Sequence, residues 1–200
     1  VVSYLLSHPP LPTALVIVIL ANIFLISYQP LISSIGTNEL GLSASVAGFL
    51  VSSVYLGGII GALFVFINKN IQYHARYMLL AILLMGIGGI GLGIFSSFTS
   101  IFVSLLIAGI GIGIWGGTEF AFFIVSSPPH MSGRILGILL FTISSWPIGI
   151  FLIGIIGDMS SLQTAVTITS SIGLVISVIL AYSNKKLLTK TIPVSRDPIN

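Results

Sequence analysis

Six long apolar stretches, separated by short polar segments, constrain this chain more than any other feature. They cover residues 11–34, 43–67, 77–98, 100–125, 134–157 and 162–182. Each exceeds the ~18 residues that mark a membrane span and is too long for a helix buried in a soluble core. The sequence therefore predicts an all-α polytopic membrane protein with a six-helix bundle at 11–184. A cytoplasmic lead-in (the end of a central loop) would precede it at 1–10, and a basic cytoplasmic tail would follow at 185–200.

Composition supports a lipid-facing surface and excludes several classes of protein. Only 6% of the 200 residues are charged, whereas soluble domains average about 25%. So few charged residues cannot cover a water-facing surface, which excludes a large extramembrane domain, a secreted fold and a nucleic-acid binder. The chain has no cysteine, which excludes disulfides, thiol catalysis and thiolate metal sites. We expect no metal and no cofactor.

The basic residues predict the orientation in the membrane. Lys69, Arg76 and Arg134 fall in or beside the segments after the second and fourth stretches, and the other four basic residues lie in the tail. Glu39 and Asp158 fall in the segments on the opposite side, which hold no Lys or Arg. Because basic residues accumulate on the cytoplasmic side, we expect a multi-pass protein of the plasma membrane with both termini in the cytoplasm.

Helix-end signals accompany several of the breaks between stretches. Ser43 and Ser132 are placed to accept hydrogen bonds from free N–H groups at helix starts. The pair Pro128-Pro129 predicts the end of the fourth helix, since proline removes a backbone donor and clashes with the preceding turn. Pro147 lies in mid-span, where it frees a carbonyl and predicts a bend in the fifth helix.

Glycine patterns favour helix packing over nucleotide binding. Residues 86–91 and 111–116 match G-x-G-x-x-G, but both lie inside apolar runs and lack an acid about 20 residues downstream. Small residues four apart instead allow helices in lipid to approach closely. The sets with this spacing are Gly109, Gly113 and Gly117 in the fourth stretch, Ser53, Gly57 and Gly61 in the second, and Gly89 and Gly93 in the third.

The sequence offers little for catalysis. His8, His74 and His130 all fall outside the predicted spans, and no H-E-x-x-H or G-x-S-x-G motif occurs. His130 and Ser132 are close in sequence, but a loop pair without an orienting acid is a weak signal for a nucleophile. We expect a protein that is not an enzyme, and an intramembrane enzyme stays the less favoured alternative.

Glu119 is the only ionisable residue well inside a predicted span. A charge near the bilayer centre costs about 2.5–3.5 kcal/mol, and such residues usually face a cavity or a partner. At about 100° per residue, Glu119 shares a helix face with Trp115, Thr118 and Phe122, roughly opposite the glycines. This face predicts a substrate or proton pathway; the alternative is a residue hydrated at the cytoplasmic interface or simply protonated.

Polar stripes on three other stretches extend this prediction. They comprise Asn22, Gln29 and Ser33 in the first stretch, Ser45, Ser52 and Tyr55 in the second, and Thr142 and Ser145 in the fifth, just before Trp146. We therefore expect the first, second, fourth and fifth helices to line a cavity. The residues predicted for the substrate and proton pathway are Glu119, Asn22, Trp115, Thr118, Gln29 and Tyr55.

Several segments together resemble one half of a major facilitator superfamily transporter. They are Pro-Pro-His-Met-Ser-Gly-Arg-Ile-Leu-Gly at 128–137, Trp-Pro-Ile-Gly at 146–149, Gly-Ile-Ile-Gly-Asp at 154–158, and residues 41–48 and 55–61. The resemblance implies a half bundle built as a 3+3 inverted repeat, completed by a second six-helix half. It also implies cavity positions for Asn22 and Glu119, with Glu119 a candidate for proton coupling or cation recognition.

The chain departs from this family in the loop after the second helix. The family's acidic and basic loop signature is reduced here to Lys69 and Arg76. Such a reduction favours the C-terminal half of a transporter. Together with Arg134, these residues are the candidates for cytoplasmic gating, and the departure puts gating by this loop in doubt.

These inferences predict a secondary transporter of small molecules that works by alternating access and is coupled to protons. Its partners would be a small-molecule substrate, the lipid bilayer and a second six-helix half, in the same polypeptide or another copy, and no nucleic acid. One acid and several aromatics favour a cationic or amphipathic substrate. The alternatives are a small pore, a self-assembling half-transporter, and a non-catalytic membrane assembly subunit.

Overall fold

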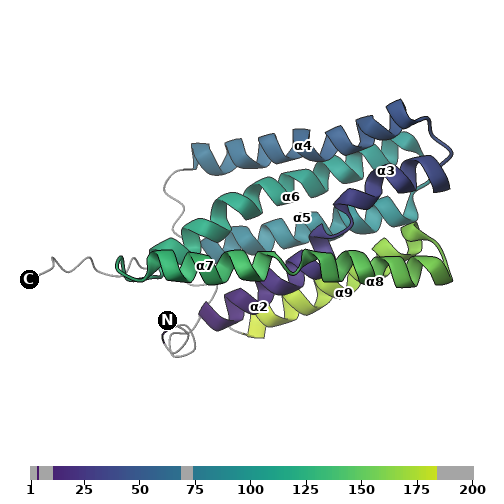
Figure 1. The fold of residues 1–200 in the computed structure, drawn as a ribbon. Helices are drawn as coiled ribbons and strands as arrows, with labels where there is room; N and C mark the ends of the chain where they lie inside the picture. Colours follow the sequence, from purple (N-terminus) through teal and green to yellow (C-terminus); the bar gives the residue numbers. More distant parts are fainter. Residues whose placement is uncertain (1–3, 5–10, 69–73, 184–200) are drawn as a thin grey trace, which may run out of the picture.

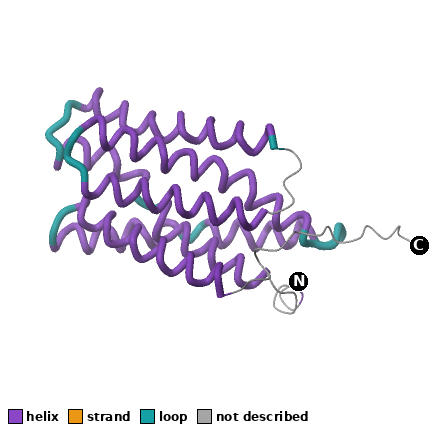
Figure 2. Tube along the Cα trace, turned by 180° about the vertical axis from the view of Figure 1, so that it is seen from behind, coloured by secondary structure: helices purple, strands orange, loops and turns teal. Residues whose placement is uncertain are grey.

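The computed structural model describes residue 4 and residues 11–68 and 74–183, which form helices joined by short turns, with no strand among them (Figures 1 and 2). The first helix is composite: α2 (Leu11–Ala21), the π-helix η1 (Asn22–Ile26), the 3₁₀ turn η2 (Gln29–Leu31), α3 (Ile32–Ser34) and the π-helix η3 (Ile35–Glu39). The others are α4 (Ala44–Ile67), α5 (His74–Ile94), α6 (Phe98–Val125), α7 (Ser132–Ile143), α8 (Trp146–Met159) and α9 (Leu162–Ser183).

Six helical runs are long and apolar enough to cross a membrane. They are Leu11–Glu39, Ala44–Ile67, His74–Ile94, Phe98–Val125, Ser132–Met159 and Leu162–Ser183. The predicted all-helical chain with six candidate spans is therefore confirmed within the described residues, and it fits a multi-pass membrane protein. The segments predicted as lead-in and tail lie outside the described residues, apart from Tyr4.

Most predicted boundaries agree with the observed helices to within a few residues, and two differ in an informative way. The first helix continues to Glu39 instead of ending at residue 34. The third ends at Ile94 and the fourth begins at Phe98. His74 and Arg76, expected in a loop, both lie in the first turn of α5.

One predicted cap is confirmed and another is wrong. The Ser43 side chain accepts a hydrogen bond from the Val46 amide and caps α4. Ser132 is not a cap, because Met131 occupies that position without a side-chain bond. The Ser132 hydroxyl instead donates to the Pro128 carbonyl at 3.0 Å.

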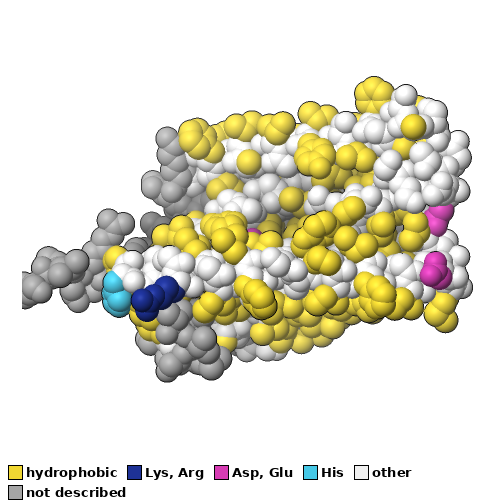
Figure 3. Space-filling model, in the orientation of Figure 1, with side chains coloured by type: hydrophobic (Ala, Val, Ile, Leu, Met, Phe, Trp, Pro, Cys, Tyr) yellow, Lys and Arg dark blue, Asp and Glu magenta, His cyan; other side chains and the backbone are white. Residues whose placement is uncertain are grey.

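The helices form an arch around the composite first helix. Helix α6 packs between α4 and α5, α5 packs on α9, and α9 packs on α8. Segment η1 contacts α8, α9 and α5, while α3 contacts α4. The space-filling view shows a groove along the open side of this arch, between α4 and the α7–α8 pair (Figure 3). The first helix thus forms the floor of an open groove.

Glycines allow the close contact of α4 with α6 that forms one side of the arch. A Cβ at Gly57 would clash with the Leu106 carbonyl oxygen, and one at Gly113 would clash with the Gly58 carbonyl oxygen. This confirms packing as a role of the small residues predicted here. Both G-x-G-x-x-G matches lie in the middle of helices, where no strand-turn-helix phosphate site can form.

The buried side chains form two clusters, one in each half of the bundle. The first joins α2 to the N-terminal half of α5, the C-terminal half of α6, and α7. The second joins the end of the first helix to the start of α4, the end of α5 and the start of α6. Arg76 and Arg134 lie near the end that the first cluster fills, and Glu39 and Asp158 lie near the other. Basic side chains are seen at one end of the molecule and acidic side chains at the other, and one further small acidic patch is visible within the groove (Figure 3).

Candidate functional site

A cavity of about 580 Å³ lies in the groove and brings together three of the six residues predicted for the substrate and proton pathway. Asn22 and Gln29 come from the first helix and Tyr55 from α4. The complete lining is Asn22, Ile26, Gln29, Pro30, Ser33, Val51, Tyr55, Ile143 and Trp146. Its volume is within the range of small-molecule sites, and its mixed apolar and polar lining is typical of them.

The cavity lies where two helices lose their regular backbone. Its first-helix residues fall in the π-helix η1, the 3₁₀ turn η2 and the single α-helical turn α3 that follows them. On the other side, α7 ends at Ile143 and α8 begins at Trp146, the two residues that line the cavity there. Pro147 has no N–H to donate to the Ile143 carbonyl, which explains this break. The helix is therefore interrupted just before Pro147, at the place where the sequence predicted a bend.

The two irregular regions pack directly against each other. A Cβ at Gly149 of α8 would clash with the Ile23 carbonyl oxygen and with the Ser27 side chain. The buried Ser27 hydroxyl donates to that same carbonyl oxygen at 2.6 Å. The glycine therefore permits a backbone approach that a side chain would prevent.

Two of the residues that line the cavity lie about midway along the length of a membrane span, as measured from a helix end. At about 1.5 Å per residue, Asn22 lies about 16 Å from the start of the first helix. Tyr55 lies about 18 Å from the end of α4, by the same rise. The hydrocarbon core is about 30 Å thick, so both residues fall near its centre. Broken helices at mid-membrane depth are where secondary transporters bind their substrates and ions.

Glu119 does not line this cavity. Its side chain is only 3% exposed, and it lies about 9 Å from the end of α6 on the helix rise. The carboxyl oxygen Oε1 is buried without a hydrogen-bond partner among the described residues.

The face of α6 that carries Glu119 is packed inside the protein. Trp115, Thr118 and Phe122 are all buried. The Thr118 hydroxyl donates to the Ile114 carbonyl at 2.7 Å, so it bonds its own helix. Trp115 and Phe122 belong to the first cluster, together with residues of α2 and α7. The structure thus separates the six predicted pathway residues into a cavity group and a buried group.

The predicted gating residues lie at the basic end. Arg76 and Arg134 are exposed in the first turns of α5 and α7. Lys69 lies outside the described residues. Because α7 continues through Ile143 into the break at Trp146, Arg134 is on the same helix as one cavity wall.

A cap between distant segments was missed by the sequence analysis. The Glu39 carboxylate accepts hydrogen bonds from the backbone amides of Leu162, at 2.5 Å, and Gln163, at 3.0 Å. The Gln163 side chain in turn donates to the carbonyl oxygens of Leu92 and Phe95. Glu39 therefore joins the end of the first helix to α9, and Gln163 joins α9 to the end of α5.

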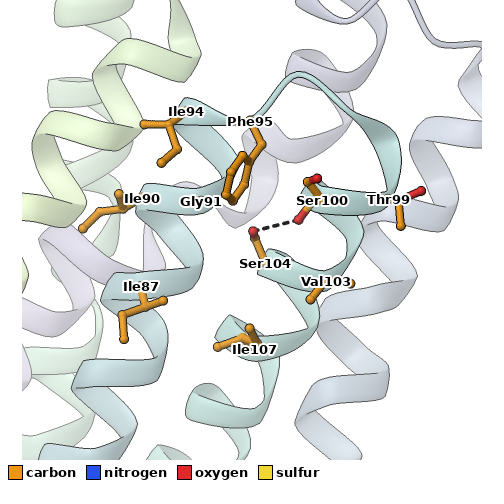
Figure 4. A pocket seen from close by; sticks show the side chains of 10 residues that line it. All are labelled: Ile87, Ile90, Gly91, Ile94, Phe95, Thr99, Ser100, Val103, Ser104 and Ile107. Carbon is orange, nitrogen blue, oxygen red and sulfur yellow. Dashed lines mark hydrogen bonds between the residues drawn. The ribbon is translucent and has the colours of Figure 1, made fainter.

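A second cavity, of about 520 Å³, lies between α5 and α6 (Figure 4). Most of its lining is apolar, including Ile87, Ile90 and Val103. The Ser104 hydroxyl at its wall donates to the Ser100 carbonyl at 2.8 Å. The hydroxyls of Thr99 and Ser100 are its other polar side chains, so this cavity has fewer polar groups to orient a ligand than the one in the groove.

The described residues contain no group of three or more His, Cys, Asp or Glu side chains that could hold a metal ion. Neither the models of known protein families nor the curated proteins match this chain.

Proposed function

We propose that this chain is one half of a secondary transporter, of the major facilitator type that its motifs resemble, and that it moves small molecules by alternating access. The observation that carries the proposal is the cavity midway along two candidate membrane spans, lined by the irregular parts of two helices. Discontinuous helices leave backbone groups and polar side chains available where a substrate must be held inside lipid. The 3+3 inverted repeat and the plasma-membrane location are parts of the same proposal.

A second six-helix half would complete the site. The groove is open between α4 and the α7–α8 pair, so the cavity lacks a wall on that side (Figure 3). A second half, in the same polypeptide or in another copy, would cover this side and enclose the substrate. A small pore is less well supported, because the first buried cluster fills the basic end below the cavity.

Glu119 is the proposed proton carrier. An ionised carboxylate is expensive in an apolar interior, and Glu119 is buried with one oxygen unpaired. Opening of the basic end would require α2, α6 and α7 to separate, which would hydrate this carboxyl group. Proton release on hydration and uptake before closure would then couple the proton gradient to the conformational cycle.

The test places proteoliposomes in a small-molecule extract and imposes a pH gradient across their membrane. Mass spectrometry then identifies the compounds that accumulate inside. We expect at least one compound to accumulate in a gradient-dependent manner with the wild-type chain and its second half. Glu119→Gln should abolish gradient dependence while the protein still inserts into the membrane.

Two outcomes would contradict the proposal separately. Accumulation that keeps its full dependence on the gradient in Glu119→Gln would remove Glu119 as the proton carrier. If no compound accumulates above protein-free liposomes, although the protein is folded and inserted, transport itself fails.

A further inference from the structure

The lining of the groove cavity contains polar side chains but no charge. Its polar members are the amides of Asn22 and Gln29, the hydroxyls of Ser33 and Tyr55, and the indole of Trp146. The remaining lining residues are Ile26, Pro30, Val51 and Ile143. Every group that this half of the site offers to a ligand is therefore apolar or a neutral hydrogen-bonding group.

Asn22 is held so that it presents an acceptor. Its amide nitrogen Nδ2 donates to the Val18 carbonyl oxygen at 2.9 Å, in the preceding turn. The side chain is more than nine-tenths buried, so this bond fixes its orientation. The amide oxygen Oδ1, which accepts, and the second N–H of Nδ2 remain for a ligand, so a ligand edge with a donor can pair with Oδ1.

Two aromatic side chains flank the same space from different helices. Tyr55 comes from α4, which packs on α3, and Trp146 comes from α8, which packs on η1. Both contribute large ring surfaces with a polar edge, which suits a ligand with a flat apolar body. The rings lie on either side of the first helix, which carries the Asn22 acceptor.

The only acid well inside the described spans is not available as a counter-charge. Glu119 does not line the cavity and is packed in the basic-end half. A charged ligand loses its hydration on entering an apolar site, and neutral dipoles without an opposite charge compensate for that loss poorly. Attraction of a cation to the rings of Tyr55 and Trp146 acts in the opposite direction and would favour binding of a positively charged ligand.

We propose that this site selects uncharged molecules that have a flat apolar ring and a hydrogen-bond donor at one edge. This inference rests on the proposed transport function and specifies its substrate class. It departs from the cationic or amphipathic substrate expected from the sequence. That expectation relied on Glu119, which does not line the cavity.

The test compares three probes of nearly the same shape: benzamide, benzamidinium and benzoate. The chain has two tryptophans, so Trp115→Phe leaves Trp146 as the single indole, and its emission reports occupancy of the cavity. We expect benzamide to change the emission saturably and to bind at least tenfold more tightly than either charged probe. Calorimetry on the wild-type chain repeats the comparison in case Trp115→Phe disturbs the fold.

A charge-introducing variant gives the test a second readout. Asn22→Asp keeps the size of the side chain but adds the missing counter-charge. Benzamidinium affinity should rise at least tenfold in this variant, and benzamide affinity should fall. Asn22→Leu, the matched control, should weaken benzamide without any gain for benzamidinium.

Equal or tighter binding of benzamidinium or benzoate to the wild-type chain would overturn the inference. So would the absence of binding by all three probes to folded protein, or accumulation in the proteoliposome experiment of charged compounds only. Failure of the transport function would look different, since benzamide would then bind with the expected selectivity while no compound accumulated.

Discussion

Individual glycines in α6 differ in what they contribute, although they belong to one sequence motif. Gly113 approaches the Gly58 backbone of α4 so closely that a Cβ would clash, whereas a Cβ at Gly116 would meet nothing within 4 Å. The two lie in the same helix, three residues apart. They therefore form a matched pair in which only one is required for packing.

We expect Gly113→Ala to lower the free energy of unfolding by about 1–3 kcal/mol, as overpacking at a tight contact does. Gly116→Ala should be neutral or stabilising by up to about 1 kcal/mol, because alanine favours helix. Unfolding in mixed micelles, followed by tryptophan emission, measures both. A loss in Gly116→Ala as large as that in Gly113→Ala would show that the α4–α6 contact is not the cause.

Residue type and spacing predicted part of the site but could not predict which helices surround each residue. Asn22, Gln29 and Tyr55 line one cavity, and the sequence analysis selected them because they are polar residues on otherwise apolar helices. Trp115 and Glu119 share a face, as their spacing predicts, but spacing does not say which neighbour covers that face. The neighbours are α2 and α7, and their packing around α6 depends on tertiary contacts that no local pattern encodes.

At the scale of elements, the extended first helix has a function that the sequence did not reveal. Hydropathy falls after residue 34, so residues 35–39 read as a loop. The structure continues them as π-helix, which places Glu39 against the first amides of α9. The partner lies more than 120 residues away in the chain, and local sequence patterns contain no information about it.

We expect Glu39→Ala to lower the free energy of unfolding by about 1–2 kcal/mol, the range for loss of a helix cap. The carboxylate also interacts favourably with the N-terminal end of the helix dipole. Asp158→Ala removes an exposed acid near the same end and should change stability by less than about 0.5 kcal/mol. Similar losses in the two variants would contradict a specific role for the cap.

The interruption between α7 and α8 offers a test of whether irregular backbone shapes the cavity. Pro147→Ala restores an N–H that can bond the Ile143 carbonyl and close the gap between the two helices. If α7 and α8 join through this bond, position 147 becomes a helix interior, where alanine is favoured over proline by up to about 3 kcal/mol. We expect higher stability, a shift in Trp146 emission in a Trp115→Phe background, and weaker benzamide binding.

Pro129→Ala is the control, because Pro129 lies in the exposed turn before α7. It should leave Trp146 emission and probe binding unchanged. Unaltered probe binding in a more stable Pro147→Ala protein would mean that the break is not needed for the site.

At the scale of the whole molecule, the number and order of helices could be predicted because lipid imposes a length and a polarity on every span. The arch and its open side could not. Which helices touch depends on close contacts such as Gly57 on α6 and Gly149 on η1. The sequence offers many glycines, and only the structure selects which of them face a neighbouring backbone.

The open side of the arch leads to a prediction about assembly. Tyr55 lines the cavity and is 66% exposed, while Ile87 is 54% exposed beside the other cavity, between α5 and α6. Since the chain has no cysteine, one can be placed at either position without a background reaction. In a symmetric pair each copy presents the same surface to its partner, so a residue inside the shared interface approaches its own counterpart.

When this chain is the only transporter half in the membrane, enclosure of the cavity requires two copies that meet across the groove. A short bis-maleimide should then crosslink Tyr55→Cys into a dimer and leave Ile87→Cys monomeric, as read by denaturing gel and native mass measurement. Benzamide should slow the Tyr55→Cys reaction, because the cysteine lies in the space that the probe occupies. Equal crosslinking at the two positions, or dimers only through Ile87→Cys, would place the contact elsewhere and leave the groove facing lipid.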